Sequence, residues 1–271
     1  MAIKLKSIAA IGALIGALAI AGCGQEEKDP NHIKVGVIVG AEQQVAEVAQ
    51  KVAKDKYGLD VELVTFNDYV LPNEALSKGD IDLNAFQHKP YLDQQIKDRG
   101  YKLVSVGNTF VYPIAGYSKK IKSLDELQDG AQVAVPNDPT NLGRTLLLLQ
   151  KVGLIKLKEN VGLLPTVLDV TENPKNLKLV ELEAPQLPRS LDDAQIALAV
   201  INTTYASQIN LTPTKDGIFI EEKDSPYVNL LVSREDNKDA ENVKKFVQAY
   251  QSDEVNEAAN KIFNGGAVKG W

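Results

Sequence analysis

Two aromatic rings and one of the chain's two histidines lie within six residues of one another, at Phe86, His88 and Tyr91. Gln87 adds an amide between the rings, so the cluster combines apolar faces with hydrogen-bonding groups. This combination favours one wall of a ligand pocket. The alternative is that both rings only fill the core, because aromatic side chains are mostly buried for packing.

A second group, around Arg144, favours the binding of an anion. Arg144 follows the polar loop 137–143, near the start of a helix predicted at 142–152. Backbone N–H groups and the positive end of the helix dipole attract an anion at such a place. A guanidinium adds a bidentate grip on a carboxylate. A surface arginine without a specific partner remains the alternative.

Three asparagines are candidates for the same site. Asn141 lies in the loop before Arg144, Asn202 ends one apolar strand pattern, and Asn229 interrupts another. An asparagine amide both donates and accepts hydrogen bonds, so it suits the polar groups of a small ligand. Each of the three could instead stabilise a turn.

The elements that must position these side chains alternate between strand and helix. The sequence predicts strands at 33–40, 61–66 and 81–86, each followed by a segment with apolar residues at helical spacing. That order is typical of parallel strands joined by crossover helices. Ligands bind such sheets at the edge where a strand gives way to a helix. Phe66 and Tyr69 close the second strand there, as Phe86 and Tyr91 close the third.

Two long extended runs, 110–118 and 227–233, are candidates for crossings between domains. Pro113 in the first run predicts a strand that bends or changes sheet. We therefore expect two α/β lobes joined by two crossover strands, with the ligand cleft between them. The expected division is 32–111 with 232–271 for lobe 1, and 112–231 for lobe 2.

The first residues have the pattern of a secretory signal. Lys4 and Lys6 precede an apolar stretch at 8–20, and small residues lead to Cys23. The stretch is shorter than the roughly 17–25 residues that a membrane span needs, although a transmembrane anchor is the alternative. The pattern itself is that of a secretory signal, and its end resembles a bacterial lipobox, which implies a lipoprotein signal peptide at 1–22, acylation of Cys23, and a lipidated tether at 23–31. The protein would then be held on a membrane and face the periplasm.

Composition and motifs exclude several classes of protein. The net charge of -6, with no cluster of lysine and arginine in the body of the chain, argues against nucleic-acid binding. Cys23 is the only cysteine and His32 and His88 are the only histidines, so no metal site is expected. The motifs G-x-S-x-G, G-x-x-x-x-G-K-S/T, G-x-G-x-x-G and H-E-x-x-H are absent. We expect no cofactor and no enzymatic activity.

Taken together, these features resemble the NlpA lipoprotein family. The resemblance covers the whole chain and rests on the cysteine of the signal, on Val35-Gly36-Val37, and on the runs 84–92, 136–144 and 198–202. It implies a type II periplasmic-binding-protein fold that holds methionine between its two lobes. It also implies delivery of methionine to the membrane permease and ATPase subunits of an ABC importer.

The same resemblance implies a role for each candidate residue. Arg144 would take the carboxylate of methionine, and the three asparagines would hold its amino and carboxylate groups. The thioether chain would be surrounded by Phe66, Tyr69, Phe86, His88 and Tyr91. Three alternatives stay open: another small apolar amino acid as the ligand, a dipeptide, or an enzyme on the same scaffold. Gly24 stands where an aspartate would favour inner-membrane retention, so the choice of membrane is open, as is the preference for L- or D-methionine.

Overall fold

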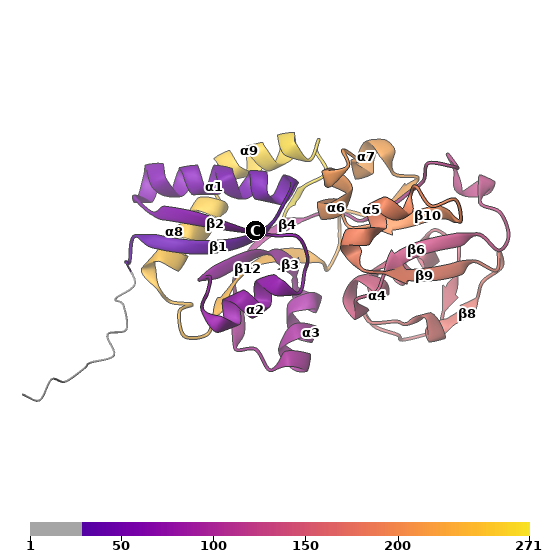
Figure 1. Ribbon diagram of the computed structural model, residues 1–271, viewed down its shortest axis with the longest axis horizontal. Coiled ribbons are helices and arrows are strands. Elements are labelled where there is room, and N and C mark those ends of the chain that lie inside the picture. Colours follow the sequence, from indigo (N-terminus) through magenta and orange to yellow (C-terminus); the bar gives the residue numbers. More distant parts are fainter. Residues whose placement is uncertain (1–28) are drawn as a thin grey trace, which may run out of the picture.

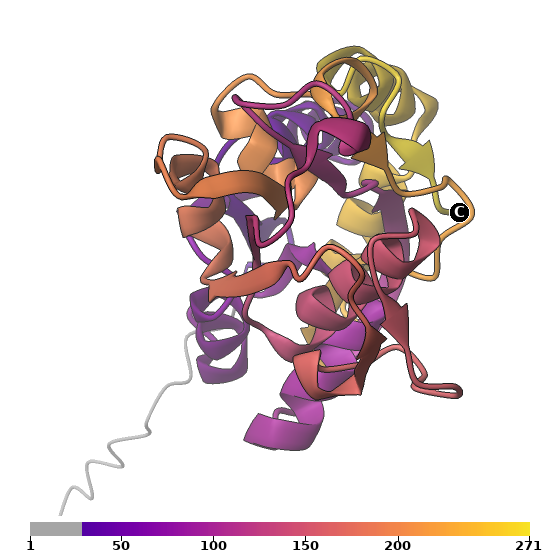
Figure 2. The same cartoon turned by 90° about the vertical axis from the view of Figure 1, so that its right-hand side faces the viewer.

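The computed structural model describes residues 29–271, so the signal peptide and Cys23 lie outside the described residues. Its two larger sheets lie side by side, each with its own helices (Figure 1). Figure 2 views the molecule from the side of the smaller of these sheets, with the N-terminal and C-terminal helices behind it. Across residues 29–271, no helix is long and apolar enough to cross a membrane.

The larger sheet has six strands in the order β13-β4-β12-β3-β1-β2. Strand β1 pairs in parallel with β2 and β3, whereas β12 is antiparallel to β3 and β4. The parallel strands joined by helices match the predicted pattern. The strands are β1 (His32–Ile38), β2 (Asp60–Phe66), β3 (Leu83–His88), β4 (Leu103–Val111), β12 (Val228–Arg234) and β13 (Val268–Lys269).

Helices cover both faces of this sheet (Figure 1). On one face α1 (Ala41–Tyr57) packs against α8 (Glu241–Tyr250) and α9 (Asp253–Ile262) around a core that includes Val45 and Phe246. On the other face, α2 (Leu71–Lys78) and α3 (Lys89–Arg99) contact β3 and β12. The sheet is therefore apolar on both sides, as a sheet with parallel strands requires.

The smaller sheet has five strands in the order β11-β5-β10-β6-β9. Its apolar core gathers around α4, whose leucines pack against β6 and β10. The strands are β5 (Ala115–Tyr117), β6 (Gln132–Pro136), β9 (Lys178–Leu182), β10 (Ile196–Ile201) and β11 (Phe219–Ile220). The helices are α4 (Pro139–Lys151), α5 (Leu187–Ser190), α6 (Thr203–Gln208) and α7 (Pro213–Asp216), and β7 (Lys156–Leu157) pairs with β8 (Val170–Glu172).

The chain crosses twice between the sheets. Strand β4 belongs to the larger sheet and β5 to the smaller, with Pro113 between them, so the predicted change of sheet is confirmed. The return runs from β11 to β12, and β12 lies wholly in the larger sheet. The expected lobe boundary after residue 231 falls inside β12. We keep the division into two lobes as a proposal, with the second crossing placed before β12.

Two local predictions were wrong. The spacing of Ser123 and Glu126 is that of a capping box and predicts a helix, but the segment is a short 3-10 turn, η1 (Leu124–Glu126), without a side-chain cap. The Glu126 carboxylate accepts instead from the backbone N–H of Lys122. The apolar residues at 167–170 predict a strand, but 167–169 form another 3-10 turn, η2 (Val167–Asp169), because Thr166 and Asp169 cap each other. A third such turn, η3 (Ala184–Gln186), precedes α5.

Candidate functional site

A cavity lies between the two sheets, where β3, β10 and β12 meet the start of α4. The space that it encloses is about 350 Å³, including the part that is open to solvent. A ligand here would contact side chains of both lobes. The lining residues are Tyr69, Phe86, Gln87, His88, Tyr91, Tyr112, Asn141, Arg144, Asn202, Thr203, Thr204 and Asn229.

Eight of the nine predicted ligand-binding residues line this cavity, and Phe66 does not. Phe66 is the last residue of β2 and packs against the cluster that contains Phe86 and Tyr91. It supports the wall from behind. Cys23, the predicted site of acylation, lies outside the described residues.

One end of the cavity is an aromatic wall. The rings of Tyr69 and Phe86 have centroids 5.8 Å apart, and those of Phe86 and Tyr91 are 6.0 Å apart. The Tyr91 hydroxyl donates to the backbone oxygen of Tyr69 at 2.8 Å, which fixes the two rings against each other. Tyr205 on α6 adds a ring from the other lobe, with its centroid 4.9 Å from that of Tyr69. Aromatic faces from both lobes therefore meet at this end.

His88 links the aromatic wall to the polar end. It is the N-cap of α3, and its Nδ1 accepts from the backbone N–H of Tyr91 at 3.2 Å. Pro90 in the first turn suits this helix start, because its missing N–H costs no hydrogen bond there. Since Nδ1 accepts, the neutral ring carries its proton on Nε2, which donates to Asn141 Oδ1 at 3.2 Å. Burial, reinforced by the charge of Arg144, lowers the pKa of His88 to about 3, so the ring stays neutral.

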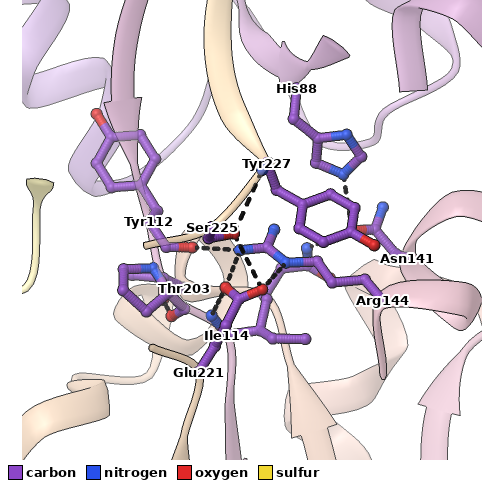
Figure 3. A network of polar contacts seen from close by, with 11 residues as sticks. His88, Tyr112, Ile114, Asn141, Arg144, Thr203, Glu221, Ser225 and Tyr227 are labelled. Carbon is purple, nitrogen blue, oxygen red and sulfur yellow. Dashed lines mark hydrogen bonds and ion pairs between the residues drawn. The ribbon is translucent and has the colours of Figure 1, made fainter. Parts of the chain in front are cut away.

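Arg144 lies at the polar end and is 3% exposed (Figure 3). Its Nε donates to Glu221 Oε1 at 2.9 Å, and its Nη2 donates to Glu221 Oε2 and to the backbone oxygen of Tyr112 at 3.1 Å. The Tyr227 ring stacks on the guanidinium, with Cζ 4.5 Å from the ring centroid. Within the described residues, Nη1 makes no hydrogen bond. One edge of the cation is therefore left for a further acceptor.

Glu221 connects Arg144 to both crossings between the sheets. Besides the guanidinium, it accepts from the backbone N–H of Ile114 at 3.4 Å and from the Ser225 hydroxyl at 3.2 Å (Figure 3). Ile114 belongs to the first crossing and Ser225 to the second. The helix that carries Arg144 begins at Pro139, three residues earlier than predicted, because Asp138 caps it by accepting from the Asn141 N–H.

Hydrogen bonds to other groups of the protein fix the side-chain amides of the three asparagines. Asn141 Nδ2 donates to Asp138, and Asn141 Oδ1 accepts from Asn202 Nδ2 at 2.8 Å. Asn229 Nδ2 donates to the backbone oxygen of Phe86 at 3.1 Å. Among the described residues, Asn202 Oδ1 is buried without a partner, and Asn229 Oδ1 makes no hydrogen bond. These two oxygens are acceptors that a ligand's N–H groups would satisfy.

The cavity can therefore bind a small molecule that is apolar at one end and zwitterionic at the other. The aromatic wall suits the apolar end, the free edge of Arg144 suits a carboxylate, and the two amide oxygens suit an ammonium group. Within residues 29–271, no group of three or more histidine, cysteine or acidic side chains is placed to hold a metal ion.

Several side chains of this region were not predicted from the sequence. Thr203, Thr204 and Tyr205 follow Asn202 at the end of β10, so the same rule about strand ends could have found them. Glu42 also follows a strand end, that of β1. Glu221 had no local signal, because its partner Arg144 lies 77 residues away in the sequence.

Relatives of known name match the whole length of the chain. The chain is 90% identical to the D-methionine-binding lipoprotein MetQ of Escherichia coli K12, and the match spans 100% of both chains. It is 88% identical to the protein of the same name from Yersinia pestis, again over 100% of both chains.

Solved structures match the fold closely. The crystal structure of the methionine-binding protein MetQ has a TM-score of 0.89 and 92% identity, over 90% of this chain and 99% of that one. A nutrient-binding protein from Burkholderia cenocepacia, solved with bound methionine, has a TM-score of 0.85 and 55% identity, over 88% of this chain and 100% of that one. The predicted two-lobe substrate-binding fold of the α/β class is confirmed. The sequence model described as NlpA lipoprotein matches residues 33–271, and the chain belongs to this family.

Proposed function

We propose that this protein binds methionine, in its L- and D-forms, in the cavity between the lobes and delivers it to an ABC importer. The observation that carries the proposal is one cavity with an aromatic wall at one end and Arg144 with two free amide oxygens at the other. An unbranched thioether is polarisable and packs favourably against aromatic rings. The names of the relatives, which refer to methionine binding, support the same ligand.

In this proposal the side chain of methionine lies among Tyr69, Phe86, His88 and Tyr91, with Phe66 packed behind them. The free edge of Arg144 receives the carboxylate. The neutral His88 adds no charge at the apolar end.

The polar groups of methionine meet the three asparagines. Asn202 and Asn229 accept from the ammonium group through their free oxygens. Asn141 orients both His88 and Asn202 through its own oxygen, so its contribution is to hold the site in shape.

We further propose that the protein is a lipoprotein anchored through acyl chains on Cys23, on a membrane and facing the periplasm. One acyl chain binds a bilayer only marginally, whereas two or more hold a protein firmly. Its partners would be the permease and ATPase subunits of the importer, and it would not be an enzyme. A relative of 50% identity, described as a periplasmic substrate-binding protein of an ABC transporter, supports this role.

Calorimetric titration of the soluble body, residues 24–271, tests the function directly. The panel contains L-methionine, D-methionine, leucine, and a dipeptide with methionine as its second residue. We expect both methionine enantiomers to bind more tightly than leucine, because leucine lacks the thioether and the length to reach along the wall. If leucine or the dipeptide binds best, the ligand is wrong. If any of these compounds is consumed on incubation, the protein is an enzyme.

A further inference from the structure

Glu42 is a buried acid next to the proposed site without a cationic partner. It is the second residue of α1 and is 3% exposed. Its Oε1 accepts from the Thr204 hydroxyl, and its Oε2 accepts from Asn229 Nδ2 at 3.4 Å. Among the described residues, no lysine, arginine or histidine forms an ion pair with it. A charge buried in this way is costly unless something compensates for it.

The two groups that Glu42 holds both line the cavity. Thr204 belongs to α6, beside the smaller sheet, and Asn229 belongs to β12 of the larger one. The carboxylate therefore links the two lobes at the edge of the site. Because Asn229 Nδ2 points to two acceptors, Glu42 and the backbone oxygen of Phe86, the Asn229 amide is fixed with its Oδ1 directed away from both.

Within the described part of the chain, the carboxylate of Glu42 has no countercharge in the empty site. Arg144 and Glu221 neutralise each other, and His88 is neutral. Burial, and to a smaller extent the charge of Glu42, raises the pKa of four tyrosine hydroxyls: Tyr69 after β2, Tyr112 after β4, Tyr205 on α6 and Tyr250 on α8. These hydroxyls therefore stay neutral. A zwitterion adds no net charge, but its ammonium group, held at Asn229 Oδ1, would give Glu42 the countercharge that it lacks.

We propose that Glu42 is a positioning residue of this site, whose carboxylate orients Asn229 toward the ligand and supplies the negative charge that balances the ligand's ammonium group. The inference rests on the proposed binding of an amino acid. Burial raises the pKa of Glu42 from its ordinary 4.5 to about 7, so the residue is partly protonated near neutral pH when the site is empty. An ammonium group nearby favours the charged form. Ligand binding should therefore release protons near pH 7.

The test pairs a residue change with a ligand change. Wild type and Glu42→Gln are titrated at pH 8 with methionine and with 4-(methylthio)butanoate, which is methionine without its amino group. Glutamine keeps the size of the side chain and can still accept from Thr204. If Glu42 balances the ammonium, the substitution weakens methionine binding roughly ten- to hundredfold and leaves the amino-free analogue within a few-fold. His32→Gln, at the half-buried start of β1, is the matched control and should change neither affinity.

Equal losses for the two ligands would overturn the inference, since a purely structural role affects both alike. A wild type that binds no amino acid would overturn the proposed function and the inference with it. Should Glu42→Gln fail to fold, wild type alone decides. Its binding enthalpy at pH 7 is compared in phosphate and Tris, which differ in ionisation enthalpy. Proton release at pH 7 that disappears at pH 8.5 supports the proposal, and the lack of any release at pH 7 overturns it.

Discussion

Replacing Arg144 by methionine should separate its structural role from its role in binding. Arg144 is buried and forms two bonds to Glu221, whose side chain is 13% exposed. Without the guanidinium, the Glu221 carboxylate keeps only the Ile114 N–H and the Ser225 hydroxyl. Breaking a buried ion pair from one side typically costs about 3–5 kcal/mol of stability. Arg144→Met alone should therefore be markedly less stable than wild type.

The affinity for methionine should fall as well, for a different reason. Removing the charged partner of a desolvated ligand carboxylate typically costs about 2–5 kcal/mol of binding free energy, which is roughly 30-fold to several-thousand-fold in affinity. Arg144→Lys should restore only part of this loss, because an ammonium lacks the planar fork that serves Glu221 and the ligand together. Loss of stability and loss of affinity are thus both expected from the single substitution.

The double variant Arg144→Met/Glu221→Gln distinguishes the two effects. It replaces the Glu221 carboxylate, which Arg144→Met leaves without a cation, by a neutral amide. Without ligand, the free energy of unfolding of the double variant should therefore return most of the way to that of wild type. Methionine titration of the same variant should still show the full loss of affinity, because the cation is absent. If the double variant binds methionine within a few-fold of wild type, the ligand carboxylate is held elsewhere. The assignment of Arg144 would then be wrong.

Three further outcomes are expected. Phe86→Ala should lower both stability, by about 3–5 kcal/mol, and methionine affinity, whereas Phe66→Ala should lower mainly stability because Phe66 lies behind the wall; unchanged affinity in Phe86→Ala would make that ring core only. The raised pKa of Glu42 means that its contribution to ligand-free stability is present below about pH 4.5 and lost as the pH rises through about 7. Over that pH range, the free energy of unfolding of wild type, measured with denaturant, should therefore fall by about 3 kcal/mol relative to that of Glu42→Gln. The same pH dependence in both proteins would contradict the raised pKa of Glu42. Cys23→Ala should give an unprocessed or soluble protein, and wild type without lipid mass at its mature N-terminus would contradict the anchor.

Much of the aromatic end was predictable because its signals are local. Phe86, His88 and Tyr91 lie within one strand-to-helix transition, so the strand period and Pro90 together placed them at one edge of the sheet. The change of sheet at Pro113 was predictable for a similar reason, since a proline cannot donate to a central ladder. Local signals were misleading at Ser123, where the capping spacing was present but η1 buries none of its residues. A cap adds only a small stabilisation, and packing decides whether a helix continues.

The balance of charge in the site was not predictable, because it depends on contacts between distant parts of the chain. The hydrogen bond between Arg144 and Glu221 joins residues that are 77 positions apart in the sequence. The one between Glu42 and Thr204 joins residues that are 162 positions apart. Neither acid differs in the sequence from the many acids that stay in solvent. Each carboxylate is removed from water only in the folded structure, where the two crossings place the lobes against each other. Burial then changes what a hydrogen bond or a charge is worth, because a group without a partner can no longer turn to solvent. For this reason the residues proposed to contact an amino acid can be predicted from strand ends, whereas Glu42 and Glu221 can be identified only from the folded structure.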